Sequence, residues 1–271
     1  MAEEPENRKE NPEQIKLFPL DADRVVKLKL GGACYAHVFR PCTEEEAREF
    51  FRSSMIELCL GLAAMRGGGE GRDQEAPKRA LYAQLVSRVE GYRVKGGGEL
   101  SALPKWQERI PLAHRMLALD RVTQVARDES DEAFEIEPEY DVTVLSALGF
   151  RGLLHRFEPV TAEDQHAFNR DSTKAKAVGG SRTGATIAPA WQNILIRLYN
   201  KKIRQVAGYS IGGRPFDSAQ GDRFAVMDPF HKVAAIQPLF YRIAVDESEE
   251  ASDLAALVGE AKRAAVEAEN A

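Results

Sequence analysis

The sequence predicts an α+β protein built as a tandem duplication of one unit, in which a β-hairpin is followed by helices. Three observations lead to this prediction. Two extended apolar segments flank a Gly-Gly pair, an amphipathic helical pattern follows them, and the same order recurs 118 residues later.

The repeat is clearest in the windows 37–54 and 155–172, which align without a gap. The identical pairs in these windows are His37/His155, Phe39/Phe157, Pro41/Pro159, Thr43/Thr161, Glu45/Glu163, Phe50/Phe168, Arg52/Arg170 and Ser54/Ser172. Further matches follow in the same order: Leu81/Leu198, Tyr82/Tyr199, Val89/Val206, Gly91/Gly208, Tyr92/Tyr209, Gly96/Gly213 and His114/His231. We therefore predict two homologous units, 24–130 and 142–248, that either have their own cores or share one.

The first unit opens on an expected β-hairpin. Val25–Leu30 and Cys34–Phe39 read as extended segments, and Gly31-Gly32 turns the chain between them. Pro41 keeps the preceding residue out of the helical region and ends the second strand.

A capped helix is expected next in each unit. Thr43 with Glu46 forms a capping box, in which the hydroxyl accepts an orphan N–H and the carboxylate reaches back. Thr161 with Asp164 repeats the device. The helix after Thr43 should place one apolar stripe against the core. The stripe consists of Ala47, Phe50, Phe51, Ser54, Met55, Leu58 and Leu62.

The second block of each unit is expected to be one helix, over 77–90 and 189–206. Gly91 and Gly208 then suit the position just after a helix, where a positive φ is common.

The third block, about 106–126 and 223–244, is expected to be mixed or helical. Pro229 and Pro238 should break it in the second unit.

The remaining segments are polar. We expect an N-terminal tail over 1–23, an acidic linker over 131–141 and an acidic, Ala-rich tail or helix over 249–271. The stretch 128–141 holds eight acids and no base, which is typical of a solvated linker.

No catalytic motif is found: phosphate-binding loops, the nucleophile elbow and paired cysteine ligands are all absent from the sequence. We therefore expect no catalytic, cofactor-binding or metal-binding residues. Cys34, Cys42 and Cys59 are interpreted as small buried apolar groups. The paired histidines are interpreted as structural, and the alternative is an enzyme or metal site between the units. That site would use His37, His114, His155 and His231.

Charge is unevenly distributed along the chain. The net charge is −5, yet the segment 170–223 holds ten bases against three acids. A helix over 189–206 would carry Arg197, Lys201 and Arg204 on one face, beside Lys202. These four residues are the candidate contacts for an anion or for nucleic acid, and the alternative is a solvated face balanced by the acidic segments.

The hairpin and the helix entry after it, Phe39-Arg40-Pro41-Cys42-Thr43-Glu44-Glu45-Glu46, resemble the opening of phage and prophage tail proteins, particularly tail assembly chaperones. The likeness covers about 30 residues in each unit. It implies an assembly role with protein partners, and members of that family generally lack catalytic residues.

Composition excludes several classes of protein. No apolar run reaches the length of a membrane span, and the polar, acidic N-terminus is unlike a secretory signal. Three cysteines without a paired motif favour a reduced, cytoplasmic setting. We therefore expect a structural or assembly protein that acts through protein–protein contacts in a phage-like tail particle and could form an oligomer. The alternatives are a nucleic-acid binder that uses the basic face of 170–223 and the enzyme or metal protein with a site between the units.

Overall fold

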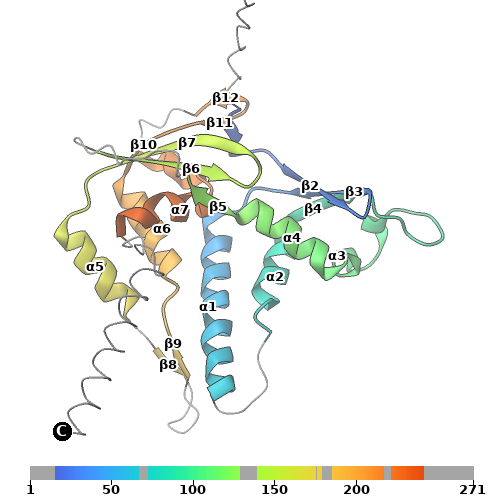
Figure 1. Cartoon of the computed structure of the whole chain (residues 1–271), viewed down its shortest axis with the longest axis horizontal. Helices are drawn as coiled ribbons and strands as arrows, with labels where there is room; N and C mark the ends of the chain where they lie inside the picture. The colour runs from blue at the N-terminus through green and yellow to red at the C-terminus, as the bar shows by residue number, and fades with distance from the viewer. Residues whose placement is uncertain are drawn as a thin grey trace, which may run out of the picture. The chain divides into compact units, whose positions relative to one another are not determined.

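A computed structural model describes residues 16–66, 73–128, 139–174, 176–178, 185–216 and 221–240. Helices and small, mostly antiparallel sheets alternate along these residues, so the α+β prediction is confirmed (Figure 1). The first half contains β1 (Phe18–Pro19), β2 (Arg24–Leu30), β3 (Ala33–Phe39), α1 (Glu44–Arg66), α2 (Ala76–Leu85), β4 (Val86–Glu90), a 3₁₀ turn η1 (Leu100–Ala102), α3 (Trp106–Arg109), α4 (Leu112–Thr123) and β5 (Val125–Arg127). The second half contains β6 (Tyr140–Ser146), β7 (Phe150–Phe157), α5 (Ala162–Ser172), β8 (Lys176–Val178), β9 (Ala185–Ile187), α6 (Trp191–Lys202), β10 (Ile203–Ala207), β11 (Tyr209–Ile211), β12 (Arg214–Pro215), a 3₁₀ turn η2 (Gly221–Val226) and α7 (Pro229–Phe240).

Each half contains a hairpin extended by a third antiparallel strand. The first sheet has the order β2-β3-β4, and the second has the order β10-β7-β6-β5. In β2, Val26 and Leu28 are buried while Lys27 and Lys29 are exposed, so alternation sets which face meets the core. The predicted hairpin is therefore confirmed.

Both predicted capping boxes are present. The Thr43 hydroxyl accepts from the Glu46 amide at 3.3 Å, and Glu46 Oε2 accepts from the Thr43 amide at 3.0 Å. Thr161 and Asp164 make the same two bonds at the start of α5. These bonds satisfy amides that a helix start leaves unpaired.

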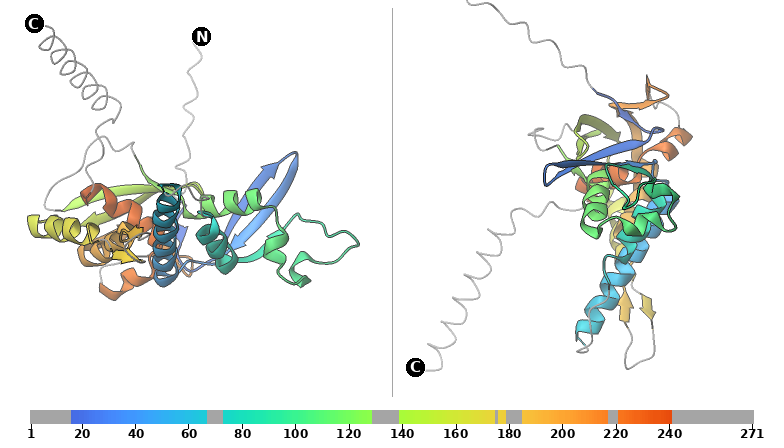
Figure 2. Two further views of the ribbon diagram at one scale, coloured as in Figure 1. Left: turned by 90° about the horizontal axis from the view of Figure 1, so that it is seen from below. Right: turned by 90° about the vertical axis from the view of Figure 1, so that its right-hand side faces the viewer.

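The apolar stripe of α1 is only partly buried, which corrects the prediction. Ala47 and Phe51 lie in the core, but Leu58 and Leu62 are exposed. Figure 1 shows the reason: the distal half of α1 runs away from the sheets, with the β8–β9 hairpin beside it, and Figure 2 shows the same pairing from other sides.

The helices expected over 77–90 and 189–206 are shorter than predicted. They end at Leu85 and Lys202, and the residues after them pair with the hairpins as β4 and β10. Gly91 and Gly208 have the expected positive φ of 87° and 88°, but each follows a strand.

Two further details of the third block and of the cysteines differ from the expectations. Pro229 is the first residue of α7, a position that suits proline, whereas Pro238 lies inside the described part of the helix without ending it. Of the cysteines, Cys42 is buried and Cys59 is half-buried, but Cys34 is exposed in the β2–β3 turn region.

The segment 1–23 is not a polar tail throughout. Phe18 and Leu20 are buried, and β1 pairs in parallel with β11 of the second half. The expected linker 131–141 ends within β6, which already includes Tyr140 and Asp141, and 129–138 lie outside the described residues. The expected tail 249–271 also lies outside them.

Residues 1–236 form one compact unit and 237–271 a second, of which the structure describes 237–240. The predicted units 24–130 and 142–248 therefore do not form separate compact bodies as far as Ile236. Strand β5 adds to β6, and the Lys232 ammonium lies 2.6 Å from Glu44 Oε2, so elements of both halves share one core. A common origin of the two halves stays a prediction of the repeat.

Candidate functional site

The matched histidines and tyrosines form two hydrogen-bonded chains, one in each half. In the first half, His37 Nδ1 lies 2.8 Å from the Tyr82 hydroxyl and His37 Nε2 lies 3.0 Å from the Tyr92 hydroxyl. The Tyr92 hydroxyl also lies 2.9 Å from His114 Nδ1. Each hydroxyl can donate one hydrogen bond and accept another, so all three contacts of this Tyr–His–Tyr–His chain can be hydrogen bonds, and only Nε2 of the last histidine lies outside them.

The second half contains the same chain at the matched positions. His155 Nδ1 and Nε2 lie 2.9 Å and 2.7 Å from the hydroxyls of Tyr199 and Tyr209, and the Tyr209 hydroxyl lies 2.9 Å from His231 Nδ1. All four of these side chains are buried.

Three of these histidines, His37, His155 and His231, are held neutral in the interior. Burial, together with His114, lowers the pKa of His37 to about 4, and burial lowers the pKa of His231 to about 4 although Asp228 opposes it. Burial places the pKa of His155 well below its ordinary value. The hydrogen bonds place the four histidines in two separate chains, two in each half. The described residues contain no group of three or more His, Cys, Asp or Glu that could hold a metal ion.

The four basic candidates lie near each other, but each has a carboxylate partner. Arg197 Nη2 lies 2.5 Å from Asp171, and Lys201 Nζ lies 2.8 Å from Asp164. Lys202 also pairs with Asp164, is buried, and donates to the Pro159 carbonyl at 3.1 Å.

Arg204 pairs with Glu158, and it lies in β10 rather than on the helix. The expected single helix face for Arg197, Lys201 and Arg204 is therefore wrong, because α6 ends at Lys202. Burial alone would raise the pKa of Asp164, but hydrogen bonds from Lys201 and Lys202 bring it well below its ordinary value. The positive charges of the four basic candidates are thus balanced by neighbouring carboxylates.

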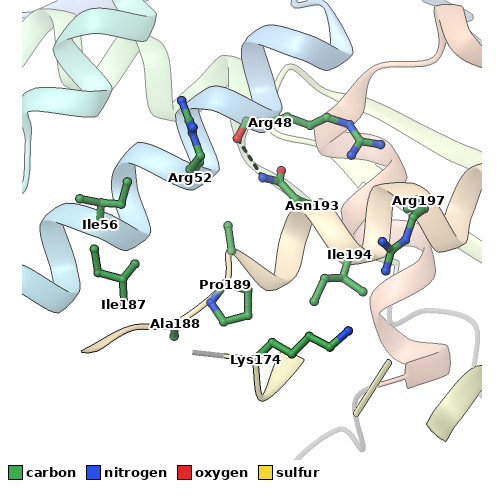
Figure 3. Close-up of a pocket in the computed structure, with 11 residues that line it drawn as sticks. Arg48, Arg52, Ile56, Lys174, Ile187, Ala188, Pro189, Asn193, Ile194 and Arg197 are labelled. Carbon is green, nitrogen blue, oxygen red and sulfur yellow. Dashed lines mark hydrogen bonds between the residues drawn. The ribbon is translucent and has the colours of Figure 1, made fainter. Parts of the chain in front are cut away.

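A cleft of about 460 Å³ lies between α1 and the junction of β9 with α6 (Figure 3). Its floor is aliphatic, and its lining includes the cations of Arg48, Arg52, Lys174 and Arg197. The Asn193 amide donates to the Arg48 carbonyl at 3.0 Å, which fixes the two walls relative to each other.

The sequence pointed to only part of this cleft. Lys174 and Arg197 belong to the basic segment 170–223, but Arg48 and Arg52 come from the other half of the chain. The sequence signal for the Tyr–His chains was stronger, because the two histidines and two tyrosines of the first chain are each repeated at the matched position of the second.

The exposed end of α1 is a second surface feature. Leu58 and Leu62 keep 42% and 46% of their surface exposed, and they lie one helical turn apart. Their face is the continuation of the stripe that buries Ala47 and Phe51.

Comparisons with protein-family models, with curated proteins and with solved structures find no match to this chain. Among the helices that the structure describes, none combines the length and the hydropathy of a membrane-spanning segment. The functional argument therefore rests on the geometry of these surfaces.

Proposed function

We propose that this chain is a non-enzymatic structural or assembly protein that acts through protein–protein contacts. The observation that carries the proposal is the exposed apolar face at the distal end of α1, formed by Leu58 and Leu62. A helical face of this kind is stabilised when a partner removes it from water.

The chemistry of the face indicates the kind of partner. Between Ser53 and Met65, Glu57 is the only charged residue in the sequence, so the helix offers aliphatic contacts with little charge. The spacing of Leu58 and Leu62 matches the packing of one helix against another. We therefore take the partner to be the apolar face of an amphipathic helix in another protein.

The resemblance of residues 39–46 to the opening of tail assembly chaperones supports the same class of function. On this proposal the partner is a component of a phage-like tail particle. Helix–helix contact through α1 would suit such an assembly, because it needs no catalytic group.

The test is affinity capture from the native host followed by cross-linking. Leu58→Glu and Leu62→Glu should abolish capture of a specific protein, with cross-links from that protein mapping to α1. Leu112→Glu is the matched control, since Leu112 is also 42% exposed but lies on α4.

The proposal fails if capture survives both α1 substitutions or is lost equally with Leu112→Glu. A dimer of the purified chain that Leu62→Glu abolishes would assign the face to a second copy, and would overturn the partner proposed here.

A further inference from the structure

The cleft between α1 and the β9–α6 junction has an aliphatic floor. Ile56 of α1 contributes to it from one wall, and Ile187, Pro189 and Ile194 contribute from the β9–α6 side, as Figure 3 shows. A volume of about 460 Å³ lies within the range typical of small-molecule sites. The floor therefore suits the hydrocarbon part of a small ligand.

One end of the cleft carries more positive than negative charge. Asp171 is the shared carboxylate for Lys174 at 2.8 Å, Arg197 at 2.5 Å and Arg170 at 3.4 Å. Lys174 and Arg197 both line the cleft, and their side chains are 65% and 60% exposed. A single carboxylate cannot saturate three cations, so this end can accept a second anion.

The rest of the lining agrees with this polarity. Arg48 and Arg52 of α1 also belong to the lining, and the carboxylates of Glu44 and Glu49 pair with them. Among the described residues, those that line the cleft include no carboxylate and no aromatic ring. The lack of a ring disfavours a stacked nucleobase, whereas a saturated chain packs well on Ile and Pro side chains.

We propose that this cleft binds an aliphatic carboxylate, with the carboxylate between Lys174 and Arg197 and the hydrocarbon chain on Ile56, Ile187 and Ile194. The site is separate from the face of Leu58 and Leu62, so it goes beyond the assembly role. Because the cations are exposed, binding should be moderate and should weaken with added salt.

The direct test is calorimetric titration of the full chain with octanoate, and with octylammonium and octanol as matched probes. Octanoate should bind, and octylammonium and octanol should bind at least about tenfold more weakly because they lack the anion. Equal binding of octylammonium would overturn the proposal.

Three substitutions locate the site. Arg197→Gln and Lys174→Gln should each weaken octanoate binding several-fold, and Asp171→Asn should strengthen it, since a competing carboxylate is removed. Arg204→Gln is the matched control, because it removes an equally exposed cation whose partner is Glu158.

Weaker binding in Asp171→Asn, or an equal loss in Arg204→Gln, would refute the site. Leu58→Glu should leave octanoate binding unchanged, so failure of the assembly role and failure of the cleft are distinguishable. Circular dichroism of each variant checks that the fold is intact.

Discussion

Acidification should destabilise this protein at a higher pH than the one at which its paired carboxylates are protonated, because three buried histidines gain a proton when the chain unfolds. His37, His155 and His231 are almost fully buried and lie in hydrogen-bonded chains that leave them neutral. Burial lowers the pKa of His231 to about 4, against an ordinary 6.5, and the pKa of His37 is also about 4.

The sign follows from which state binds the proton first. As the pH falls below 6.5, the unfolded chain protonates these histidines while the folded chain does not until about 4. The stability that these neutral histidines contribute is therefore fully present above pH 6.5 and is lost as the pH falls from 6.5 toward 4. Linkage gives a loss of about 2 kcal/mol at about pH 5 for His231, and a similar loss for His37.

Carboxylates act in a different window. Hydrogen bonds and ion pairs hold the pKa of Glu44 at about 2 despite its burial, and those from Arg40 do the same for Glu46. Their stabilisation is present above the ordinary 4.5 and is lost only below it. Between about pH 6.5 and pH 5 the change in stability therefore reports the histidines.

The assay is urea unfolding followed by circular dichroism between about pH 7.5 and pH 5. His231→Asn should remove about 2 kcal/mol of the pH-dependent loss while lowering stability at neutral pH. His166→Asn is the control, because it removes an exposed histidine of α5 that belongs to neither Tyr–His chain. A flat stability between about pH 7.5 and pH 5, or an unchanged slope in His231→Asn, would refute the reasoning.

Two further substitutions test an ion pair between the halves and a close backbone contact within the first half. Asp228→Asn should cost about 3 kcal/mol or more in urea unfolding, because it leaves the buried Arg24 guanidinium without the carboxylate that lies 2.5 Å away. A loss below about 1 kcal/mol would contradict this. Gly91→Ala should lower the thermal midpoint more than Gly97→Ala, since both have positive φ but a Cβ at Gly91 would lie 2.4 Å from the Cys34 carbonyl oxygen. Equal shifts would show that the close contact does not matter.

Sequence reasoning succeeded where local chemistry decides the structure. The Gly31-Gly32 turn and the Thr43 and Thr161 capping boxes depend on residues a few positions apart, and all were found as expected. It failed at Val86–Glu90 and Ile203–Ala207, where the helical pattern continues but the chain forms strands. Only the open edges of β3 and β7, which come from elsewhere in the sequence, decide that outcome.

Local sequence patterns could not predict the cleft or the ion pairs between the halves, because these too join residues that are far apart in the sequence. Arg48 and Arg197 line one cleft although 149 positions separate them, and no repeat position links them. The basic segment did predict an accumulation of charge, but its pairing with Asp164 and Asp171 depends on how α5 packs against α6.

The two Tyr–His chains show how a repeated sequence can acquire different environments. The second chain is fully buried because Phe18 of β1 packs against it, with its ring 4.4 Å from that of His231. In the part of the chain that the structure describes, the first chain has no such cover, and Tyr92 and His114 remain half-buried beside Tyr35. Since β1 precedes the repeat, the difference between the halves comes from a segment outside it. The four matched positions are therefore fully buried in the second half and only partly buried in the first.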